Sequence, residues 1–477
     1  MCNIGSKIRD YCGVFGIVSK DFSYSVAGLI YSGLMALQHR GQLYSGISIS
    51  SCEGPIDTYK GKGLVSKVLS PKTLRNFIGN VGIGHVCYGN PYCSNEENAQ
   101  PYLYKSNKIE FSIALNGRIT NPTEIQIKLE KMGRVLTGIS DIELLASLIA
   151  AFYDLTNHIF DALKDMMKVV RGAYCIVVLT KKGDIFAIRD SIGYKPLCFG
   201  SLEREDKQFY VFASESCALD VIGAKVIDDV KPGEIVYVNP TESLKREQII
   251  PHLKHGICSY EYIYFARPDS IIDGISVGKV RYNLGINLAI GDDVPSENTI
   301  VVPVPDSGRS AAMGYSWKSK ITYAEGLMKN RYLWQLKKDF NEKLNPIKAI
   351  TYDKDIVLVD DSIVSGITMK KIIEMLRNVG SKLIHVRISC PPLIKNCDLN
   401  DSLSNRDIFI ALEAKIKNFD NFNEEMRKYI GADSLKYQSL NGLIDAIGKS
   451  EDKICSICLK EICDLDEEII RNKIEIV

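Results

Sequence analysis

Residues 355–380 read DIVLVDDSIVSGITMKKIIEMLRNVG and predict a strand, a loop and a helix in that order. The aliphatic run 356–359 has the length of a buried parallel strand. The loop 362–368 is rich in small residues, and Gly380 ends a helix whose apolar residues stand at positions 372, 373, 376 and 379. The stretch is typical of an open α/β sheet.

Two carboxylates, Asp360 and Asp361, stand where the predicted strand ends. Ligands of open α/β sheets bind just beyond the carboxyl ends of the strands. Backbone N–H groups of a loop that opens a helix can cradle a phosphate, and carboxylates at that rim can hold sugar hydroxyls or a hard cation. A phosphate-containing ligand is therefore one interpretation, and a solvated strand–loop–helix corner is the other.

The same stretch resembles the phosphoribosyl-diphosphate (PRPP) signature of type I phosphoribosyltransferases, which combines a hydrophobic strand, two acidic residues and a phosphate loop. The resemblance implies that PRPP contacts a set of groups along this loop, namely Asp360, Asp361, Ser362, Gly366 and Thr368. Ser365 and Ile367 stand where the family most often has Arg and Thr.

Length and charge limit the possible classes of protein. At 477 residues we expect two or three domains. A net charge of +1 gives no electrostatic case for binding nucleic acid or an anionic membrane. No apolar run is long enough to span a bilayer, and the start MCNIGSKIRDY lacks the apolar core of a secretory signal, so we expect a cytoplasmic protein. Its 14 cysteines should then be catalytic or metal-binding rather than disulfide-bonded.

Cys12 begins an apolar strand, CGVFGIVS, and a small buried hydrophobe is the ordinary role of such a cysteine. The downstream sequence, however, resembles class II glutamine amidotransferases, which have an N-terminal-nucleophile fold. The resemblance implies that Cys12 becomes the catalytic N-terminal residue once residues 1–11 are removed as a propeptide. Its thiolate would attack glutamine while its own α-amine carries the proton. Cys2 needs only Met removal, but it lacks the GVFGI continuation that follows Cys12.

Further family segments follow in the same order along the chain. Asn116 and Gly117, in LNGRITN, match the oxyanion-hole pair of the family, and Asp141 matches the residue that holds the α-amino group of the substrate. A turn or a helix cap is the ordinary role of such Asn and Asp residues. Cys87 stands where the family has the arginine that clamps the substrate carboxylate, a contact that a neutral thiol does not replace.

The second half resembles glutamine PRPP amidotransferases most specifically at 258–274, CSYEYIYFARPDSIIDG. At 302–315, VPVPDSGRSAAMGY predicts a strand, a turn and a small-residue helix, and the resemblance assigns Asp306, Ser307 and Gly308 to the pyrophosphate loop. An ordinary Pro-Asp-Ser-Gly turn is the alternative. The family further implies Mg²⁺ near Ser307, Asp360 and Asp361. The segment LWQLKKDFNEKLNPI, 333–347, replaces the longer loop that closes over PRPP in the family.

Four cysteines match the positions that hold the cluster in the iron–sulfur branch of this family: Cys258, Cys397, Cys455 and Cys458. The resemblance implies a structural [4Fe–4S] cluster with four thiolate ligands. Zinc suits four thiolates equally well. Cys390 and Cys463 are close enough in sequence to be alternative ligands.

The predicted fold is α/β, an N-terminal-nucleophile αββα sandwich over 12–245 followed by a type I phosphoribosyltransferase parallel-sheet domain over 258–450. Residues 451–477 form a cysteine-bearing tail, and 241–257 is the predicted linker. The implied function is amidophosphoribosyltransferase: glutamine supplies ammonia, which displaces pyrophosphate from PRPP in the first step of purine biosynthesis.

The departures at Cys87, Ser365, Ile367 and the loop 333–347 support two alternative hypotheses. One is a diverged, inactive paralogue that serves as a structural or regulatory subunit of an active homologue. The other is a phosphoribosyltransferase that uses ammonia only. We expect a homo-oligomer under the main hypothesis and a hetero-oligomer with an active paralogue under the first alternative.

Overall fold

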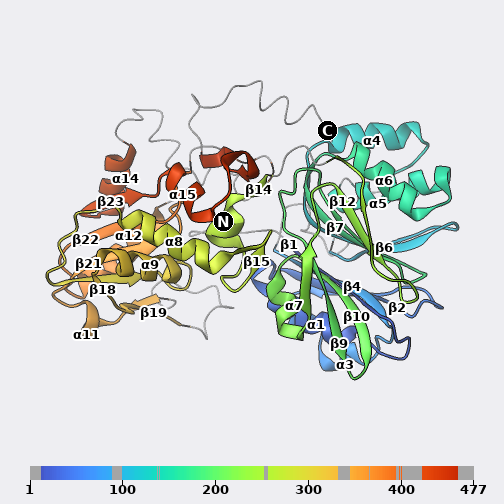
Figure 1. Cartoon of the computed structure of the whole chain (residues 1–477), viewed down its shortest axis with the longest axis horizontal. Coiled ribbons are helices and arrows are strands. Elements are labelled where there is room, and N and C mark those ends of the chain that lie inside the picture. Colours follow the sequence, from blue (N-terminus) through green and yellow to red (C-terminus); the bar gives the residue numbers. More distant parts are fainter. Residues whose placement is uncertain are drawn as a thin grey trace.

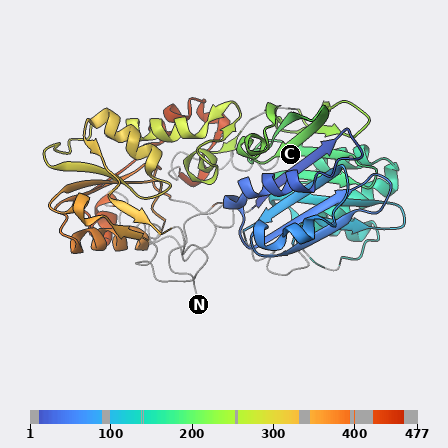
Figure 2. The same ribbon diagram turned by 90° about the horizontal axis from the view of Figure 1, so that it is seen from below.

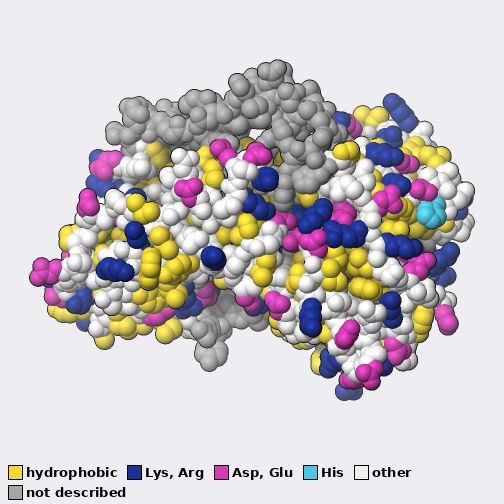
Figure 3. All heavy atoms as spheres, viewed as in Figure 1, with side chains coloured by type: hydrophobic (Ala, Val, Ile, Leu, Met, Phe, Trp, Pro, Cys, Tyr) yellow, Lys and Arg dark blue, Asp and Glu magenta, His cyan; other side chains and the backbone are white. Residues whose placement is uncertain are grey.

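The computed structural model of the chain describes residues 12–88, 99–136, 138, 140–251, 256–330, 344–364, 366–393, 397, 399 and 422–459. Two lobes lie side by side along the longest axis, one built from the first half of the chain and one from the second (Figures 1 and 2). None of the described helices is long and apolar enough to cross a membrane. Side chains of both charge signs are interspersed over the face in Figure 3, as the net charge of +1 leads one to expect.

The N-terminal lobe holds two antiparallel sheets. The first has the strand order β11-β9-β10-β1-β4-β2-β3. Its strands are β1 (Cys12–Ser19), β2 (Tyr44–Ser50), β3 (Asp57–Lys62), β4 (Val81–Cys87), β9 (Cys198–Arg204), β10 (Lys207–Ala213) and β11 (Lys225–Asp229). The second has the order β13-β12-β8-β7-β6-β5. Its strands are β5 (Tyr102–Lys105), β6 (Glu110–Ile119), β7 (Gly172–Thr180), β8 (Ile185–Arg189), β12 (Glu234–Val238) and β13 (Lys245–Gln248).

Helices cover the outer faces of both sheets. α1 (Ala27–Ala36) and α7 (Ser216–Ile222) pack on the first sheet, and α4 (Pro122–Lys131), α5 (Asp141–Thr156) and α6 (Ile159–Val169) belong to the second. β1 is apolar at nearly every position because both of its faces are buried. Val14 and Val18 face the core between the sheets, while Phe15 and Ile17 face the helices. The predicted αββα sandwich is confirmed.

The predicted linker 241–257 is partly wrong, because β13 lies inside it and pairs with β12. This strand extends the N-terminal lobe to residue 248. Its four residues, KREQ, are charged or polar and mostly exposed, so the strand has no apolar alternation that a sequence pattern could reveal.

The C-terminal lobe is built on a five-stranded parallel sheet of order β18-β17-β21-β22-β23. The strands are β17 (Thr299–Pro303), β18 (Thr322–Tyr323), β21 (Asp355–Asp360), β22 (Ile384–Ile388) and β23 (Ser434–Tyr437). In β21, Val357 and Val359 face α8 (Val277–Ala289) and α9 (Arg309–Ser319), whereas Ile356 and Leu358 face α12 (Ile367–Asn378) and α14 (Phe422–Ile430). Both faces of the sheet are therefore buried, and the predicted strand and helix within 355–380 are confirmed.

Shorter elements complete the described chain. The helical ones are α2 (Val65–Val68), α3 (Pro71–Leu74), α11 (Lys348–Thr351), α15 (Leu440–Ile447), the 3₁₀ turns η1 (Gln38–Arg40), η8 (Glu451–Lys453) and η9 (Ile457–Leu459), and the π-helix η4 (Glu261–Phe265). The two-stranded pairs are β14 (Ile257–Cys258) with β24 (Ile454–Cys455), β15 (Ile271–Ile272) with β16 (Ile275–Ser276), and β19 (Leu327–Lys329) with β20 (Leu344–Pro346).

Candidate functional site

Cys12, the predicted nucleophile, is the first residue of β1 and is only 5% exposed. It packs in a small buried cluster with Tyr44, Cys87 and Ala99. The strand register places Cys87 directly opposite Cys12, and Tyr44 directly opposite Cys87 on its other side. Cys87, which the sequence analysis matched to the position of the family arginine, is therefore a direct neighbour of the predicted nucleophile. Residues 1–11 and Cys2 lie outside the described residues.

The predicted oxyanion pair lies near the end of β6. Asn116 is completely buried, and within the described residues neither polar atom of its side chain has a hydrogen-bond partner. Buried amides are normally bonded, so this one has its full donor and acceptor capacity available for a ligand. Gly117 has φ +131°, and a Cβ there would lie 1.9 Å from the carbonyl oxygen of Ala173. Only glycine fits at this position, which leaves its N–H unobstructed by a side chain.

Asp141 opens α5, and its Oδ2 accepts a hydrogen bond of 3.0 Å from the N–H of Ile119, two residues after Gly117. Burial raises the pKa of this carboxyl, and the Ile119 bond and the nearby Arg118 act in the opposite direction. The structure thus brings Asp141 to the same strand end as the oxyanion pair.

A histidine connects this strand to the nucleophile's sheet. His85, two residues before Cys87 in β4, has Nε2 3.0 Å from the carbonyl oxygen of Leu115, the residue before Asn116. Burial lowers the pKa of His85 to about 4, so its imidazole is neutral at pH 7. This contact holds the end of β6 against β4, the strand that pairs with β1, and so brings the predicted oxyanion pair close to the strand that carries the predicted nucleophile.

A buried ion network ties the loop beside this site to the second lobe. The Arg40 guanidinium contacts the Glu215 carboxylate and lies 2.6 Å from Glu261 of η4, with all three side chains fully buried. His39 reaches the same Glu215 oxygen at 2.6 Å. Burial would raise the pKa of Glu215, but Arg40 and His39 hold it well below its usual range. The next residue, Gly41, passes so close to β4 that a Cβ would lie 2.4 Å from the Cys87 nitrogen.

The predicted PRPP residues gather at the carboxyl ends of β17 and β21. Asp360 and Asp361 are 2% and 1% exposed. Ser307 Oγ donates to Asp360 Oδ1 at 3.2 Å, the Asp361 N–H donates to the same oxygen at 2.9 Å, and Ser362 Oγ donates to Asp361 Oδ2 at 2.7 Å. The two segments that the sequence analysis singled out, 302–315 and 355–380, therefore meet in one site.

Two helix N-termini point at this edge of the sheet. Gly308 precedes α9, and a Cβ there would lie 2.3 Å from the carbonyl oxygen of Val359 in β21. Gly366 precedes α12 with φ +70°, and Thr368 lies in the first turn of that helix. Helix N-termini carry unpaired N–H groups and a partial positive charge, so a pair of them favours a ligand with two phosphates. Ser365 lies outside the described residues.

Two cations at this edge were missed from the sequence. Arg309 and Lys329 lie 2.7 and 3.0 Å from the exposed carboxylate of Asp306. Both are ordinary surface residue types in their segments, and only the convergence of α9 with β19 places them together. Arg309 also lies 3.3 Å from Glu325, so both cations are paired with carboxylates, with which a diphosphate would compete. Most of the loop 333–347 lies outside the described residues.

The four cysteines of the predicted cluster converge where the C-terminal segment meets the junction between the lobes. β14 and β24 pair in register, so Cys258 lies opposite Cys455. Burial raises the pKa of the Cys258 and Cys458 thiols well above the ordinary value, and each is raised further by the other cluster cysteines, including Cys397. Among the described residues, no three His, Cys, Asp or Glu side chains are arranged to hold a single metal ion.

Cys390 and Cys463 were the alternative ligands. Cys390 is buried, and its sulfur lies 3.4 Å from the Tyr260 hydroxyl. Its charge also raises the pKa of Cys458, so it borders the cysteine group. Cys463 lies outside the described residues.

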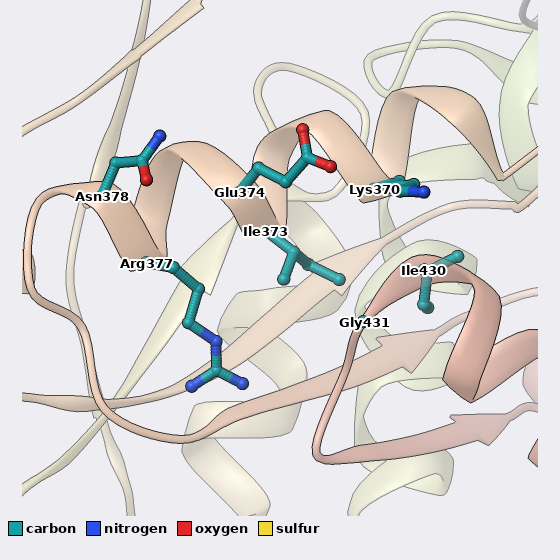
Figure 4. A pocket seen from close by; sticks show the side chains of 7 residues that line it. All are labelled: Lys370, Ile373, Glu374, Arg377, Asn378, Ile430 and Gly431. Atoms are coloured by element: carbon teal, nitrogen blue, oxygen red, sulfur yellow. The ribbon is translucent and has the colours of Figure 1, made fainter.

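A hollow of about 380 Å³ lies on the outer surface of α12 (Figure 4). It is lined by side chains of α12 and the end of α14: Lys370, Ile373, Glu374, Arg377, Asn378, Ile430 and Gly431. None of the residues that the sequence analysis assigned to a site lines it.

Two family models match this chain, one in each lobe. Residues 91–221 match a family model described as a glutamine amidotransferase domain, and residues 289–405 match one described as a phosphoribosyl transferase domain. The amidophosphoribosyltransferase of Methanothermobacter thermautotrophicus is 39% identical over 466 residues, covering 95% of this chain and 94% of that protein. The amidophosphoribosyltransferase of Bacillus subtilis is 37% identical, with 95% and 93% coverage.

A solved structure agrees with the sequence relatives. Glutamine PRPP amidotransferase from B. subtilis, complexed with ADP and GMP, matches with a TM-score of 0.84 and 36% identity, over 94% of this chain and 96% of that one. Since relatives of this similarity match over almost the whole length of both chains, this chain belongs to the amidophosphoribosyltransferase family of enzymes, with a glutamine amidotransferase domain followed by a phosphoribosyltransferase domain.

Proposed function

We propose that this chain converts PRPP and glutamine to 5-phosphoribosylamine, pyrophosphate and glutamate, the first step of purine biosynthesis. The observation that carries the proposal is the edge of the parallel sheet where two buried carboxylates, Asp360 and Asp361, meet two helix N-termini. Such an edge suits a sugar that carries phosphates. An amidotransferase sandwich on the same chain supplies the nitrogen.

In the transferase half, the N-termini of α9 and α12 bind the phosphates, with Arg309 and Lys329 as added cations. Asp360 and Asp361 accept hydrogen bonds from the ribose hydroxyls. The residues that would hold Mg²⁺ are Ser307, Asp360 and Asp361, whose oxygen ligands fit a hard cation. Mg²⁺ bound there neutralises charge on the departing pyrophosphate.

In the glutaminase half, removal of residues 1–11 exposes the α-amine of Cys12. The Cys12 thiolate attacks the amide carbon of glutamine, and the α-amine accepts the thiol proton and later passes it to departing ammonia. Water then hydrolyses the resulting thioester, which releases glutamate and restores the Cys12 thiol. Asn116 and the Gly117 N–H donate to the oxyanion, and Asp141 holds the substrate α-amino group. The support for Asn116 is its buried amide, which has no hydrogen-bond partner among the described residues.

The cysteines Cys258, Cys397, Cys455 and Cys458 are proposed to hold a structural [4Fe–4S] cluster that fastens the tail, 451–477, to the domain junction. The support is the in-register pairing of β14 with β24, which places Cys258 opposite Cys455, together with the mutual influence of Cys258, Cys397, Cys455 and Cys458 on the pKa values of Cys258 and Cys458.

We propose a first domain over 12–245, lengthened to the end of β13 at residue 248, a second domain over 258–450, and a cytoplasmic location. A homo-oligomer is proposed as well, supported by the exposed side chains of Met313 and Trp317, which lie one turn apart on α9. Large apolar side chains together on a surface favour contact with a partner, here a second copy of the chain.

One observation favours a second candidate function, an ammonia-only enzyme or an inactive subunit of an active paralogue. Cys87 lies beside the nucleophile and offers no cation to the substrate carboxylate. A lost ionic clamp weakens glutamine binding directly.

The deciding experiment measures 5-phosphoribosylamine formation by anaerobically purified protein with PRPP and Mg²⁺. Activity with glutamine supports the full reaction. Activity with ammonium salt alone identifies the ammonia-only enzyme. Activity with neither substrate overturns the proposal in favour of a subunit role.

A further inference from the structure

Cys87 lies directly across the sheet from Cys12, the predicted nucleophile. β1 and β4 run antiparallel, and Cys12 and Cys87 are direct partners in their register. Side chains of direct partners lie on the same face of a sheet. How close the two sulfurs can come depends on whether the pair is hydrogen-bonded or non-hydrogen-bonded, because side chains are closer in the second kind.

The hydrogen bonds around the pair identify its kind. Val14, two residues after Cys12, bonds away from β4: its N–H donates to Ser214 Oγ at 3.0 Å and its carbonyl accepts from the Ser214 N–H at 3.0 Å. Backbone groups two residues apart in a strand point the same way, so those of Cys12 also point away from β4. The Cys87 carbonyl accepts from the Leu43 N–H at 2.8 Å, on the β2 side. Cys12 and Cys87 are therefore a non-hydrogen-bonded pair.

Such a pair has its Cα atoms about 4.5 Å apart, which falls inside the range of about 4.4–6.8 Å that disulfides span. Both cysteines are buried, and they pack in one cluster with Tyr44 and Ala99. Each sulfur therefore lies within bonding reach of the other. We propose that position 87 is an oxidative modification site, at which Cys87 forms a cross-strand disulfide with Cys12 when a peroxide oxidises the protein.

The chemistry balances with hydrogen peroxide as the oxidant. One thiolate attacks the O–O bond, forms an S–O bond and releases hydroxide, which gives a sulfenic acid. The second thiolate attacks that sulfur, the S–S bond forms, and the S–O bond breaks with loss of hydroxide. Two thiols and one peroxide become one disulfide and two waters. A dithiol reductant reverses the product by two thiol–disulfide exchanges.

Another cysteine in the same lobe provides a contrast. Cys175 is also buried in a central strand, but its register partners are Asn116 and Arg189. Cys175 has no cysteine opposite it in either neighbouring strand. It is therefore the matched control for a disulfide that requires two cysteines on adjacent strands.

The consequence for activity rests on the proposed function. A disulfide occupies the sulfur that attacks glutamine, so glutamine-dependent synthesis stops. The PRPP site lies in the other lobe and keeps its ammonia-dependent activity. Cys87 would then protect the nucleophile, because a disulfide is reducible whereas sulfinic and sulfonic acids are not under these conditions.

The test uses the full chain, purified anaerobically and treated with stoichiometric hydrogen peroxide, then alkylated and digested. We expect one peptide pair joined between Cys12 and Cys87 in the wild type and in Cys175→Ser, and none in Cys87→Ser or Cys87→Ala. Dithiothreitol should separate the pair. Separate alkylation of both cysteines in the treated wild type would overturn the proposal.

Activity gives an independent readout. In the wild type, dithiothreitol should restore most of the glutamine-dependent rate lost to peroxide. In Cys87→Ser the loss should persist after reduction, and equal recovery in both proteins would contradict the protective role. If the untreated chain does not use glutamine, the proposed function fails, yet the joined peptides still decide whether the disulfide forms. The cluster absorbance, followed in parallel, separates damage to the metal centre from oxidation of Cys12.

Discussion

Replacing Asn116 with leucine should weaken the glutaminase while leaving the fold intact or making it more stable. The side chain is completely buried, and neither of its polar atoms has a partner within the described chain. An unpaired buried polar group costs about 1–3 kcal/mol. Leucine has nearly the same shape and no polar atoms, so Asn116→Leu should raise the free energy of unfolding by up to about that amount.

The same substitution removes the proposed side-chain donor to the oxyanion. Loss of one such donor typically lowers kcat by about 10²–10³-fold. We therefore expect the glutamine-dependent rate to fall by about two to three orders of magnitude while the ammonia-dependent rate is unchanged. The two rates, measured on one preparation with urea unfolding of the same sample, separate the effect on the site from the effect on stability.

Asn121 is the matched control. It is also buried, but its amide donates to the Val169 carbonyl at 3.0 Å and its Oδ1 accepts from the Arg171 N–H at 3.0 Å. Asn121→Leu leaves those groups unpaired and should destabilise the protein by about 1–3 kcal/mol without changing the ratio of the two activities. If Asn116→Leu destabilised the protein as much as Asn121→Leu, the Asn116 amide would have to be bonded in the native state, and the reasoning would fail.

Four further changes test other parts of the structure. The folded-state pKa of Glu215 lies well below its ordinary value of 4.5. The free energy of unfolding of the wild type should therefore exceed that of Glu215→Gln by the largest amount above pH 4.5, and the difference should shrink as the pH falls toward the folded-state pKa. Urea titrations at several pH values measure this difference. Cys87→Arg alone should overpack the buried site beside Tyr44. A lower KM for glutamine is therefore expected only in the double variant that also carries Tyr44→Ser. A lower KM in the single variant would show that the site has room for the arginine. Asp361→Asn should lower both glutamine- and ammonia-dependent synthesis by at least about tenfold, through weaker PRPP binding measured by calorimetry, and an effect on glutamine alone would contradict its placement. Cys455→Ser should abolish the cluster absorbance and lower the thermal midpoint, and unchanged iron content would refute its role as a ligand.

The sequence alone predicted the parts of the fold in which an apolar pattern of residues stands directly before residues suited to bind a ligand. The aliphatic run before Asp360 and Asp361 could only be a buried strand, and the small residues after it form the turn into α12. β13 could not be predicted, because its residues are polar and its pairing with β12 depends on the tertiary fold. The network of Arg40, Glu215 and Glu261 was also invisible, since these residues are brought together from distant parts of the chain.

Within the site, residue type indicated Asn116 and Gly117, but sequence could not show that the Asn116 amide is buried without a partner among the described residues. It also could not show that Cys87 faces Cys12, because a strand register is fixed by packing and turns rather than by either residue. The sequence indicated only that position 87 lacks the expected arginine. That Cys87 lies opposite Cys12 is known only from the register of the sheet.

The contact between Arg40 and Glu261 has a consequence for how this enzyme can be divided. The guanidinium belongs to the loop that passes close to the backbone of Cys87, while Glu261, one of the carboxylates that contact it among the described residues, comes from the junction to the other lobe. An amidotransferase fragment cut before residue 257 would lose the buried Glu261 carboxylate that contacts this cation, beside the proposed glutamine site. Removing one partner of a buried ion pair costs about 3–5 kcal/mol. The two halves are thus not interchangeable modules, and a glutaminase transplanted onto another acceptor domain would need a carboxylate supplied at the same point.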